Sequence, residues 1–502
     1  MSIEPAAPGG DGFAPGVIDT ARVTRNVFVT VGVQVVSWAL TFVVTMFVPR
    51  YLGPETFGRL TTAGAFMTVG FLLAPWGMGP VLTKEIARVP GRLGNLVVNA
   101  LVLRVGLALS LGTITLVTGY LLGYRGMMIW LLAITAVSML VAGVNEVFAA
   151  ALAGEERFRR QGFVALIDKA IASGASLLLV AARAPLALFA APALAAALVQ
   201  AAMHASRLRA AQRHVTAALR PSRETIRFLL VAGLPYLGQT AFLTLYGQTD
   251  VLVLSLVADY QTVGWYTVAW KLVGTTMFLP VAVSTALLPT FTRLHHAGDE
   301  VAFAQLGRRA LEIVLVAGVP IAVVMLLIPG VIIGQLYTED FAGSVAVLRI
   351  GGICSLLYYV TIILCTMVNA REQQKRLVAT SIAVCTAGVP SCFLFSWLGH
   401  TQFGNGAAGA VLSDVLVELV LLVALLRIVP RNFIVRETRL QCGRFALAAL
   451  PMAGFLHFML GRGAGLWIVA PASALYLTGL WALGAVDRTY IDLLQRALRR
   501  AP

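Results

Sequence analysis

Long uncharged stretches recur along the chain, separated by short segments that carry charge, glycine and proline. A helix needs about 20 apolar residues to cross about 30 Å of hydrocarbon, so each such stretch predicts a membrane-spanning helix. The predicted spans are residues 27–48, 60–83, 105–124, 126–145, 163–182, 185–206, 226–257, 261–290, 307–334, 343–369, 377–398, 403–428, 444–461 and 464–485. The pattern therefore predicts an all-α membrane protein with fourteen transmembrane helices.

One boundary between predicted spans is only weakly marked. Residues 377–413 contain no Asp, Glu, Lys or Arg, and only the segment GHTQFGNG, 399–406, divides them into two passages. If the stretch were a single passage, thirteen spans would place the two termini on opposite sides of the membrane.

Composition changes at both ends and near the middle of the chain. Residues 1–24 include the text EPAAPGGDGFAPG and predict a disordered cytoplasmic tail. A charged cytoplasmic linker at 209–224 divides the bundle into an N-lobe, 25–208, and a C-lobe, 225–430. Residues 431–502 supply the last two spans and a tail that fits an amphipathic helix lying in the membrane interface.

The distribution of positive charge predicts the orientation. The 502 residues are 59% hydrophobic and 12% charged, with a formal net charge of +15. Lys and Arg accumulate in cytoplasmic loops, and with both termini in the cytoplasm only five basic residues face outward: Arg50, Arg59, Arg125, Arg183 and Arg462. The net charge is then an orientation signal and an attraction to anionic membrane lipids, and it does not indicate nucleic acid as a partner.

Two short internal similarities relate the lobes. FGRLTTA at 57–63 is similar to VGWYTVA at 263–269, which aligns Gly58 with Gly264. LAGEERFRR at 152–160 is similar to VNAREQQKR at 368–376. Both pairs are displaced by six spans, which predicts two related six-helix lobes of the same orientation. The segment PRYLGPETFGR is then an outer hairpin, serving either as a connector or as part of a gate.

The motifs of common enzyme chemistries are absent from the sequence. It contains no GxxxxGK[ST], HExxH or GxSxG. The five cysteines form no CxxC, which argues against a disulfide framework or a zinc site. Because the predicted loops are short and basic, the chain is predicted to be a transporter rather than an enzyme, and to need no metal or organic cofactor.

Basic residues deep inside the predicted spans are the first candidates for a substrate site. A charge at mid-membrane costs about 2.5–3.5 kcal/mol, so a deep charge indicates a cavity or a partner. The guanidinium fork of Arg matches diphosphate oxygens, which favours an anionic substrate. The predicted substrate-binding residues are Arg104, Lys271, Arg50 and Arg59, together with the aromatic residues Trp265, Tyr266 and Trp270, which would stack on sugars.

Acidic residues inside the spans are candidates for ion coupling. They are Asp250, Asp414, Glu418 and Glu146. Asp414 and Glu418 are four residues apart and share one helix face. Binding of a proton or sodium ion there would couple transport to a gradient, whereas pairing of the acids with Arg104 or Lys271 would give them a structural role. Proline and glycine inside the spans, including Pro75, Gly77 and Pro235, predict kinks.

Several segments together resemble the polysaccharide biosynthesis, or oligosaccharide-lipid flippase, family, whose superfamily also contains the multidrug and toxic compound extrusion pumps. The resemblance covers residues 25–430, and the segments that carry it are RYLGPETFGRL, LTKEIAR, ALAGEERFRRQGFVAL, VGWYTVAWKL and LYTEDFAGSVAVLRI. It implies a V-shaped pair of lobes in a bacterial inner membrane that open alternately to either side. It also implies a substrate, an undecaprenyl-diphosphate-linked oligosaccharide for exopolysaccharide, O-antigen or capsule, with a polysaccharide polymerase and a chain-length regulator as candidate partners.

Three alternatives remain open at this stage. A cation-coupled extrusion antiporter would have a net acidic cavity and usually twelve spans. A flippase for the lipid-linked peptidoglycan precursor would be expected to have several arginines in its first span, where residues 27–48 have none. A membrane-embedded glycan polymerase or ligase would be expected to have a large outer loop.

Overall fold

The computed structural model describes residues 20–155, 158–212, 221–429, 433, 436–463 and 465–485, and within them every regular element is helical. The α-helices are α1 (Thr20–Gly70), α2 (Met78–Arg88), α3 (Leu93–Leu121), α4 (Met127–Gly154), α5 (Phe158–Ala181), α6 (Ala191–Gln212), α7 (Arg223–Val257), α8 (Tyr260–Thr276), α9 (Phe278–His296), α10 (Glu300–Leu327), α11 (Pro329–Leu336), α12 (Ser344–Ala370), α13 (Gln374–Phe403), α14 (Gly406–Ile428), α15 (Arg436–Leu460) and α16 (Val469–Ala482). Short 3-10 turns are η1 (Pro90–Arg92), η2 (Leu186–Leu188), η3 (Glu339–Phe341) and η4 (Leu466–Ile468).

These helices confirm the predicted all-α membrane fold. Within the described residues, eleven stretches are long and apolar enough to cross a membrane, and two shorter apolar helices accompany them. Every predicted span overlaps a helix of the structure. The count of fourteen stays a prediction, because several helices are continuous or broken where the sequence pattern marks separate spans.

Glycine and proline set the breaks in the first two predicted spans. α1 contains two helices that meet at Gly53, whose φ of 75° and ψ of 166° are not helical. A glycine adopts such a positive φ without the steric cost that a Cβ would add. A second break follows α1 at residues 71–77, where Trp76 has φ 43° and Gly77 has φ 64°. The kink predicted at Pro75 and Gly77 falls in this break.

The weakly marked boundary in the second half of the chain is a turn at Gly404 and Asn405. α13 ends at Phe403, Gly404 has φ 63°, and Asn405 Oδ1 accepts a hydrogen bond of 3.1 Å from the amide of Ala408 at the start of α14. The predicted division is therefore confirmed. The predicted end of the span at residue 398 is wrong, because helical hydrogen bonding continues through GHTQF.

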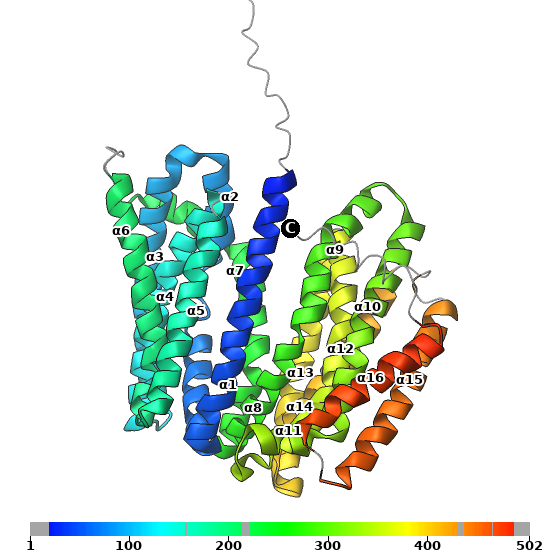
Figure 1. Ribbon diagram of the computed structural model, residues 1–502. Helices are drawn as coiled ribbons and strands as arrows, with labels where there is room; N and C mark the ends of the chain where they lie inside the picture. Colours follow the sequence, from blue (N-terminus) through cyan, green and yellow to red (C-terminus); the bar gives the residue numbers. More distant parts are fainter. Residues whose placement is uncertain are drawn as a thin grey trace, which may run out of the picture.

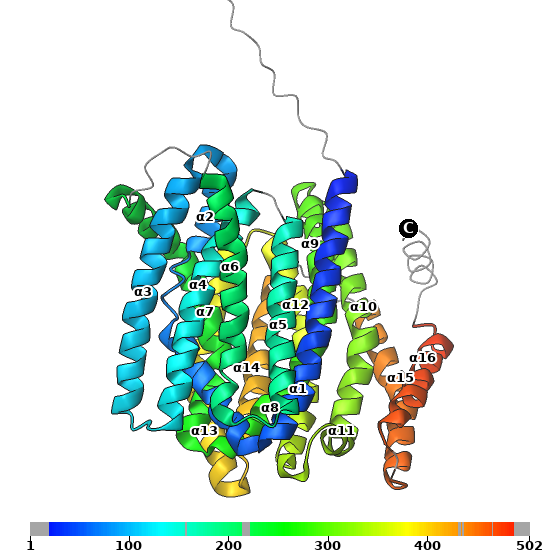
Figure 2. The ribbon, with the colours of Figure 1, turned by 60° about the vertical axis from the view of Figure 1, so that its left-hand side comes forward.

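The helices form two groups with α1, α7 and α8 between them. Figure 1 shows α2 to α6 on one side and α9 to α16 on the other, and Figure 2 shows the same helices turned by 60°. α7 contacts both groups. Near its start, the indole N–H of Trp76 donates to the carbonyl of Leu230 at 3.0 Å, and the Ser222 amide donates to Asn99 Oδ1 at 2.7 Å. Its far end reaches α13 and α14. α7 thus joins the N-lobe to the C-lobe.

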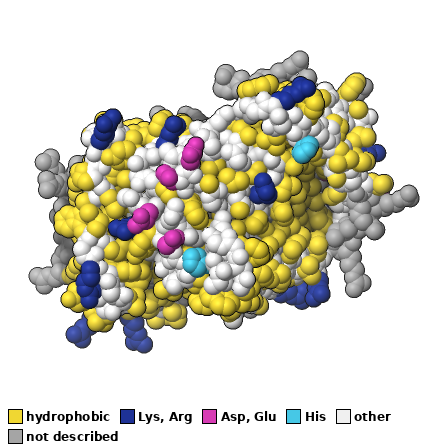
Figure 3. Space-filling view, turned by 90° about the horizontal axis from the view of Figure 1, so that it is seen from below, with side chains coloured by type: hydrophobic (Ala, Val, Ile, Leu, Met, Phe, Trp, Pro, Cys, Tyr) yellow, Lys and Arg dark blue, Asp and Glu magenta, His cyan; other side chains and the backbone are white. Residues whose placement is uncertain are grey.

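The two groups share a hydrophobic core at the predicted outer end. Ala184 and Phe189, between α5 and α6, belong to the same cluster as Ile333 of α11 and Val347 of α12, with residues of α1, α7 and α8 between them. Figure 3 views this end and shows acidic side chains gathered over one part of it. The exposed acidic residues of its connections are Glu55, Asp259, Glu339 and Asp340. The lobes are therefore in contact here.

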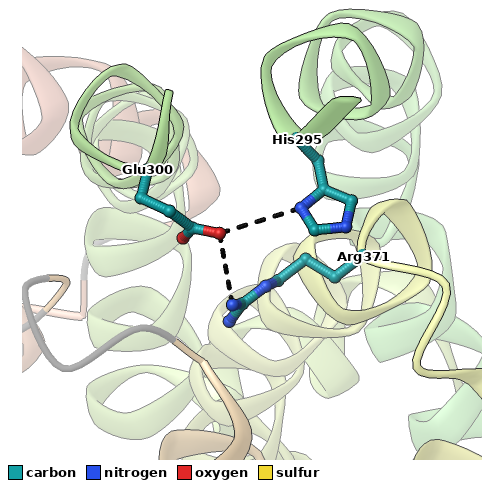
Figure 4. A network of polar contacts seen from close by, with 3 residues as sticks. All are labelled: His295, Glu300 and Arg371. Atoms are coloured by element: carbon teal, nitrogen blue, oxygen red, sulfur yellow. Dashed lines mark hydrogen bonds and ion pairs between the residues drawn. The ribbon is translucent and has the colours of Figure 1, made fainter. Parts of the chain in front are cut away.

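A polar network links three helices at the predicted cytoplasmic end. Glu300 Oε1 at the start of α10 lies 3.3 Å from Nη2 of Arg371, which follows α12, and 3.7 Å from Nδ1 of His295 on α9. Figure 4 shows the two side chains converging on the same carboxylate oxygen. The network holds the ends of α9, α10 and α12 together within the C-lobe.

The predicted terminal and linking segments lie largely outside the described residues. Residues 1–19 of the predicted tail and all of 486–502 are outside them. α1 begins at Thr20, so the last residues of the predicted tail, 20–24, are helical. Residues 213–220 of the predicted linker are also outside, while α6 extends to Gln212 and α7 begins at Arg223.

Candidate functional site

Three acidic side chains lie close together inside the C-lobe, and we call them the acidic cluster: Asp250, Asp414 and Glu418. Asp250 projects from α7, and the other two project from α14. Asp414 is 7% exposed and Glu418 only 1%. The helix face predicted for Asp414 and Glu418 is thus a buried one.

Hydrogen bonds from two neighbouring helices fix the carboxylate of Asp250. The hydroxyl of Tyr266 on α8 donates to Oδ2 at 2.7 Å, and the thiol of Cys392 on α13 donates to Oδ1 at 3.3 Å. A thiol is a weak donor, so the phenol is the stronger of the two contacts. The orientation of Asp250 therefore depends on α8 and α13 as well as on its own helix.

The other two acids each retain an oxygen without a donor. Asp414 Oδ2 and Glu418 Oε2 are buried and accept no hydrogen bond from the described residues, whereas Glu418 Oε1 accepts one from the hydroxyl of Thr361. Buried polar atoms are usually satisfied, so such exceptions need an explanation. A cavity reaches Asp250 and Asp414, and Glu418 is not among its lining residues. The arrangement can accept a small cation such as a proton at the Asp414 carboxylate, which lines that cavity.

The described residues contain no group of three or more His, Cys, Asp or Glu side chains arranged to hold a metal ion. The oxygens of the acidic cluster therefore do not converge as a carboxylate metal site. A single exchangeable proton requires no such convergence.

Aromatic side chains surround the acidic cluster. The Tyr246 and Tyr358 hydroxyls are 3.2 Å apart, Tyr266 stacks on Trp270 with ring centroids 5.6 Å apart, and Trp270 meets Tyr358 edge-on at 6.2 Å. Tyr266 is 2% exposed. In this conformation Tyr266 and Trp270, predicted to stack on sugars, pack beside the acidic cluster. A role in sugar binding stays a prediction.

Trp265 connects α8 to the segment before α12. Its indole N–H donates to the carbonyl of Asp340 at 2.7 Å, and its ring lies against Gly343, where an added Cβ would come within 2.2 Å of ring carbons. The hydroxyl of Ser344 donates to the Trp265 carbonyl at 2.9 Å. These contacts fix α8 against the start of α12 at the predicted outer end.

Lys271 is a predicted substrate cation that forms no ion pair among the described residues. Its side chain projects from α8 and is exposed, although the position lies well inside a predicted span. Nζ lies 4.9 Å from the centroid of the Phe57 ring on α1, within the range of a cation–π contact. Among the described residues no carboxylate forms an ion pair with it. Its role in binding an anionic substrate stays a prediction.

Arg104 has a different environment. It is 6% exposed on α3, and Nη2 lies 2.5 Å from Glu146 Oε2 on α4, so these two predicted site residues pair with each other. Nε and Nη1 have no acceptor among the described residues. Glu146 is 64% exposed. The pairing corresponds to the structural alternative that the sequence left open.

The seat of Arg104 gives a stability prediction. A Cβ at Gly143 of α4 would lie 2.4 Å from Arg104 Nε, so Gly143→Val is expected to displace the guanidinium and to destabilise the protein by about 1–3 kcal/mol, as overpacking does. Thermal unfolding of the purified protein in detergent measures the loss. Gly106→Val is the matched control because nothing lies within 4 Å of its added Cβ. Equal losses of stability in Gly143→Val and Gly106→Val would contradict the packing of Arg104 against Gly143.

The remaining predicted cations lie at the predicted outer end. Arg50 is exposed. Arg59 pairs with Glu55, with Nη2 2.6 Å from Oε1, and its guanidinium carbon lies 5.5 Å from the centroid of the Tyr260 ring. The structure does not bring these two residues together with Lys271 and Arg104 into a single group.

Sequence reasoning missed several residues around the acidic cluster. Thr361 and Cys392 donate hydrogen bonds to it, Tyr246 lines the same cavity as Asp250 and Asp414, and Phe57 contacts Lys271. A signal existed for Tyr246, which is one helical turn before Asp250 on the same face of α7. Nothing local marked Thr361 or Cys392, since each is far from the acids in sequence.

Comparisons with known families give two matches. The profile of the family described as "Polysaccharide biosynthesis protein" matches residues 23–295, and that of the MatE family matches residues 235–394. No curated protein matches the sequence.

Solved structures with a similar fold include a lipid II flippase MurJ in an inward closed conformation. It has a TM-score of 0.71 and 14% identity, covering 94% of this chain and 100% of that one. An inward-facing multidrug resistance MATE family transporter of the MOP superfamily has a TM-score of 0.61 and 17% identity, covering 78% and 94%. A MATE transporter in complex with MaD3S has a TM-score of 0.52 and 15% identity, covering 80% and 95%. At these identities the likeness concerns the fold.

Proposed function

The chain belongs to the polysaccharide biosynthesis protein family, and on this premise we propose that it is a flippase for a lipid carrying a diphosphate-linked oligosaccharide. The substrate is expected to be an undecaprenyl-diphosphate-linked repeat unit of exopolysaccharide, O-antigen or capsule. The lobes would open alternately to the two sides of the membrane and move the glycan from the cytoplasmic to the outer leaflet. The fold shared with the lipid II flippase supports the proposal.

The observation that carries the proposal is the environment of Lys271. An exposed ammonium at membrane depth, without a carboxylate partner among the described residues, suits a transient anionic ligand. The diphosphate supplies that anion in every substrate of this class, whatever the sugars. Arg50 and Arg59 at the predicted outer end are proposed to contact it after Lys271, as it leaves.

Reconstituted vesicles test the proposal. The purified protein is inserted into vesicles that contain an undecaprenyl-diphosphate-linked oligosaccharide with a fluorescent label on the glycan, and an impermeant quencher is added outside. We expect the inner-leaflet label to become quenchable with time in protein-containing vesicles and to stay protected in protein-free ones. Undecaprenyl monophosphate bearing the same label is the matched control for the diphosphate, and we expect it to be flipped more slowly. Equal rates with and without the protein would refute flippase activity.

We further propose that the acidic cluster couples transport to a cation gradient. Asp414 Oδ2 and Glu418 Oε2 lack donors among the described residues and are the proposed binding atoms. The proton is the favoured ion because it needs no converging ligands, and sodium remains the alternative. A bound ion shifts a conformational equilibrium only if its affinity differs between the two states. The cluster meets this condition if movement of α7 changes the contacts of Asp250.

A cation-coupled extrusion antiporter is the second candidate. The buried acids and the match of residues 235–394 to the MatE family favour it. Uptake of a fluorescent organic cation into the same vesicles distinguishes the two functions. Transport of lipid II instead of the oligosaccharide lipid would favour a third candidate, a flippase for the peptidoglycan precursor.

The proposed location is the bacterial inner membrane, with both termini in the cytoplasm. The excess of Lys and Arg in the connections at one end of the bundle supports this orientation. On the opposite side the flipped glycan would be available to a polysaccharide polymerase and a chain-length regulator, which remain proposed partners.

A further inference from the structure

Two glycines from different lobes meet where α1 crosses α8. An added Cβ on Gly58 would lie 1.8 Å from the carbonyl oxygen of Tyr260, and one on Gly264 would lie 2.1 Å from the carbonyl oxygen of Pro54. Both obstacles are backbone atoms, which cannot rotate away as a side chain would. The contact is reciprocal, since each helix places a glycine against the carbonyl of the other.

Two cation–π contacts flank this crossing and are also reciprocal. Arg59 of α1 lies over the ring of Tyr260, with Cζ 5.5 Å from the centroid, and Lys271 of α8 lies over the ring of Phe57, with Nζ at 4.9 Å. Each lobe therefore contributes one cation and one aromatic ring. Such contacts contribute about 0.5–1 kcal/mol at exposed sites and about 2 kcal/mol when desolvated, and the Phe57 ring is only 3% exposed.

One further hydrogen bond joins the lobes at this end. The hydroxyl of Tyr337, in the segment between α11 and α12, donates to the carbonyl of Thr45 in α1 at 3.0 Å. Burial raises the pKa of Tyr337, so its hydroxyl stays protonated and remains a donor at physiological pH. The contact does not depend on pH.

We propose that the Gly58–Gly264 crossing is the outer gate of the transporter, closed in this structure, and that the Lys271–Phe57 contact links the substrate cation to that gate. The gate opens when α1 and α8 separate, because that movement breaks both backbone contacts and both cation–π contacts at once. Lys271 then loses its contact with the Phe57 ring, so the environment of the substrate cation changes as the gate opens. The second part of this inference depends on the proposed function, whereas the gate itself does not.

The positions of the glycines explain why the gate can close. A helical Cβ at either position would hold the two backbones apart, because contacts under 3.0 Å essentially never occur with real Cβ atoms. Gly58 and Gly264 are also the residues that the internal similarity aligns between the lobes. The aligned pair therefore forms a direct contact, which the sequence pattern alone did not predict.

Labelling of a cysteine below the crossing tests the gate. Gly274 is exposed on α8 and has nothing within 4 Å of an added Cβ. Ten helical residues from Gly264, it lies about 15 Å further from the outer end, at 1.5 Å per residue. Gly274→Cys is labelled in right-side-out membrane vesicles with an impermeant maleimide. Labelling of the parent that retains Gly274 is subtracted to remove the signal of native cysteines.

We expect Gly58→Ala and Gly264→Ala each to raise the rate of outer labelling by about tenfold, which corresponds to about 1.4 kcal/mol in the gate equilibrium. Gly64→Ala is the matched control on α1, because nothing lies within 4 Å of its added Cβ, and its labelling rate should equal that of the parent. Unchanged labelling in both folded gate variants would overturn the proposal.

If the alanine variants fail to insert into the membrane, two variants that each remove one aromatic ring test the gate instead. Tyr260→Leu removes the ring under Arg59 and should raise outer labelling two- to threefold, or about 0.5–1 kcal/mol as a cation–π contact contributes. Tyr120→Leu removes the ring under Arg125, a cation–π pair at 3.8 Å within the N-lobe, and should leave labelling unchanged. Equal labelling of the two variants would overturn the gate.

The labelling and flipping experiments separate the two proposals. Labelling that responds to the gate variants, in a protein that flips no lipid, would support the gate and refute the proposed function. Flipping that proceeds normally, together with labelling that ignores every gate variant, would refute the gate and leave the function standing.

Discussion

Lys271→Met is expected to reduce the rate of flipping of the diphosphate-linked oligosaccharide by about 10- to 100-fold. The ammonium offers a charge-assisted hydrogen bond to a phosphate oxygen, and such bonds contribute about 1.5–3 kcal/mol. Methionine retains most of the length and volume of the lysine stem, so packing changes little. The initial rate of quenching in the vesicle assay measures the effect.

Matched variants show whether the charge is the cause. Lys271→Arg keeps the charge and should retain most of the activity, because a guanidinium also binds phosphate. Lys84→Met removes an exposed lysine near the end of α2 and should have no effect. If Lys271→Met flips the lipid as fast as the unmodified protein, the cationic site is refuted.

The double variant Asp414→Asn with Glu418→Gln is expected to abolish the response of flux to an ion gradient. A tenfold gradient supplies about 1.4 kcal/mol per ion, so coupled flux should change several-fold when the gradient is imposed. The amides keep the shape of the carboxyl groups but neither gain nor lose a proton under these conditions. Flux should then be the same with and without the gradient.

The gradient experiment compares pH and sodium separately in the same vesicles. A response to pH alone supports proton coupling, and a response to sodium alone replaces the proton with sodium at the acidic cluster. Glu339→Gln, which changes an exposed acid near the predicted outer end, should keep the full response. A double variant that still responds to the gradient would remove the acidic cluster from the coupling mechanism.

The sequence pattern predicted the helices because each crossing needs a long apolar stretch. It could not predict which face of each helix packs, because helices that are apolar on all sides carry little periodic signal. Arg104 illustrates this limit. Its depth was evident from the sequence, but its partner on α4 and its seat against Gly143 depend on how α3 packs against α4.

The acidic cluster shows a similar limit for a functional site. The four-residue spacing of Asp414 and Glu418 correctly predicted a shared face. Their relation to Asp250 requires α7 to meet α13 and α14, and Asp250 is 142 residues from its α13 partner Cys392. The spacing of residues along one helix identifies only neighbours on that helix. The sequence therefore showed the three acids as separate charges and not as a cluster.

The position of α7 across both lobes also bears on the order in which the protein is assembled during synthesis. The part of α7 that contacts Trp76 and Asn99 finds its neighbours already made, since those residues precede it in the chain. Asp250 on the same helix enters the bilayer before Cys392 has been translated. An acid at mid-membrane costs about 2.5–3.5 kcal/mol, so the nascent chain carries this cost until its later helices arrive. Early docking of α7 on the N-lobe, which is already synthesised, therefore fixes the position of Asp250 before α13 is inserted.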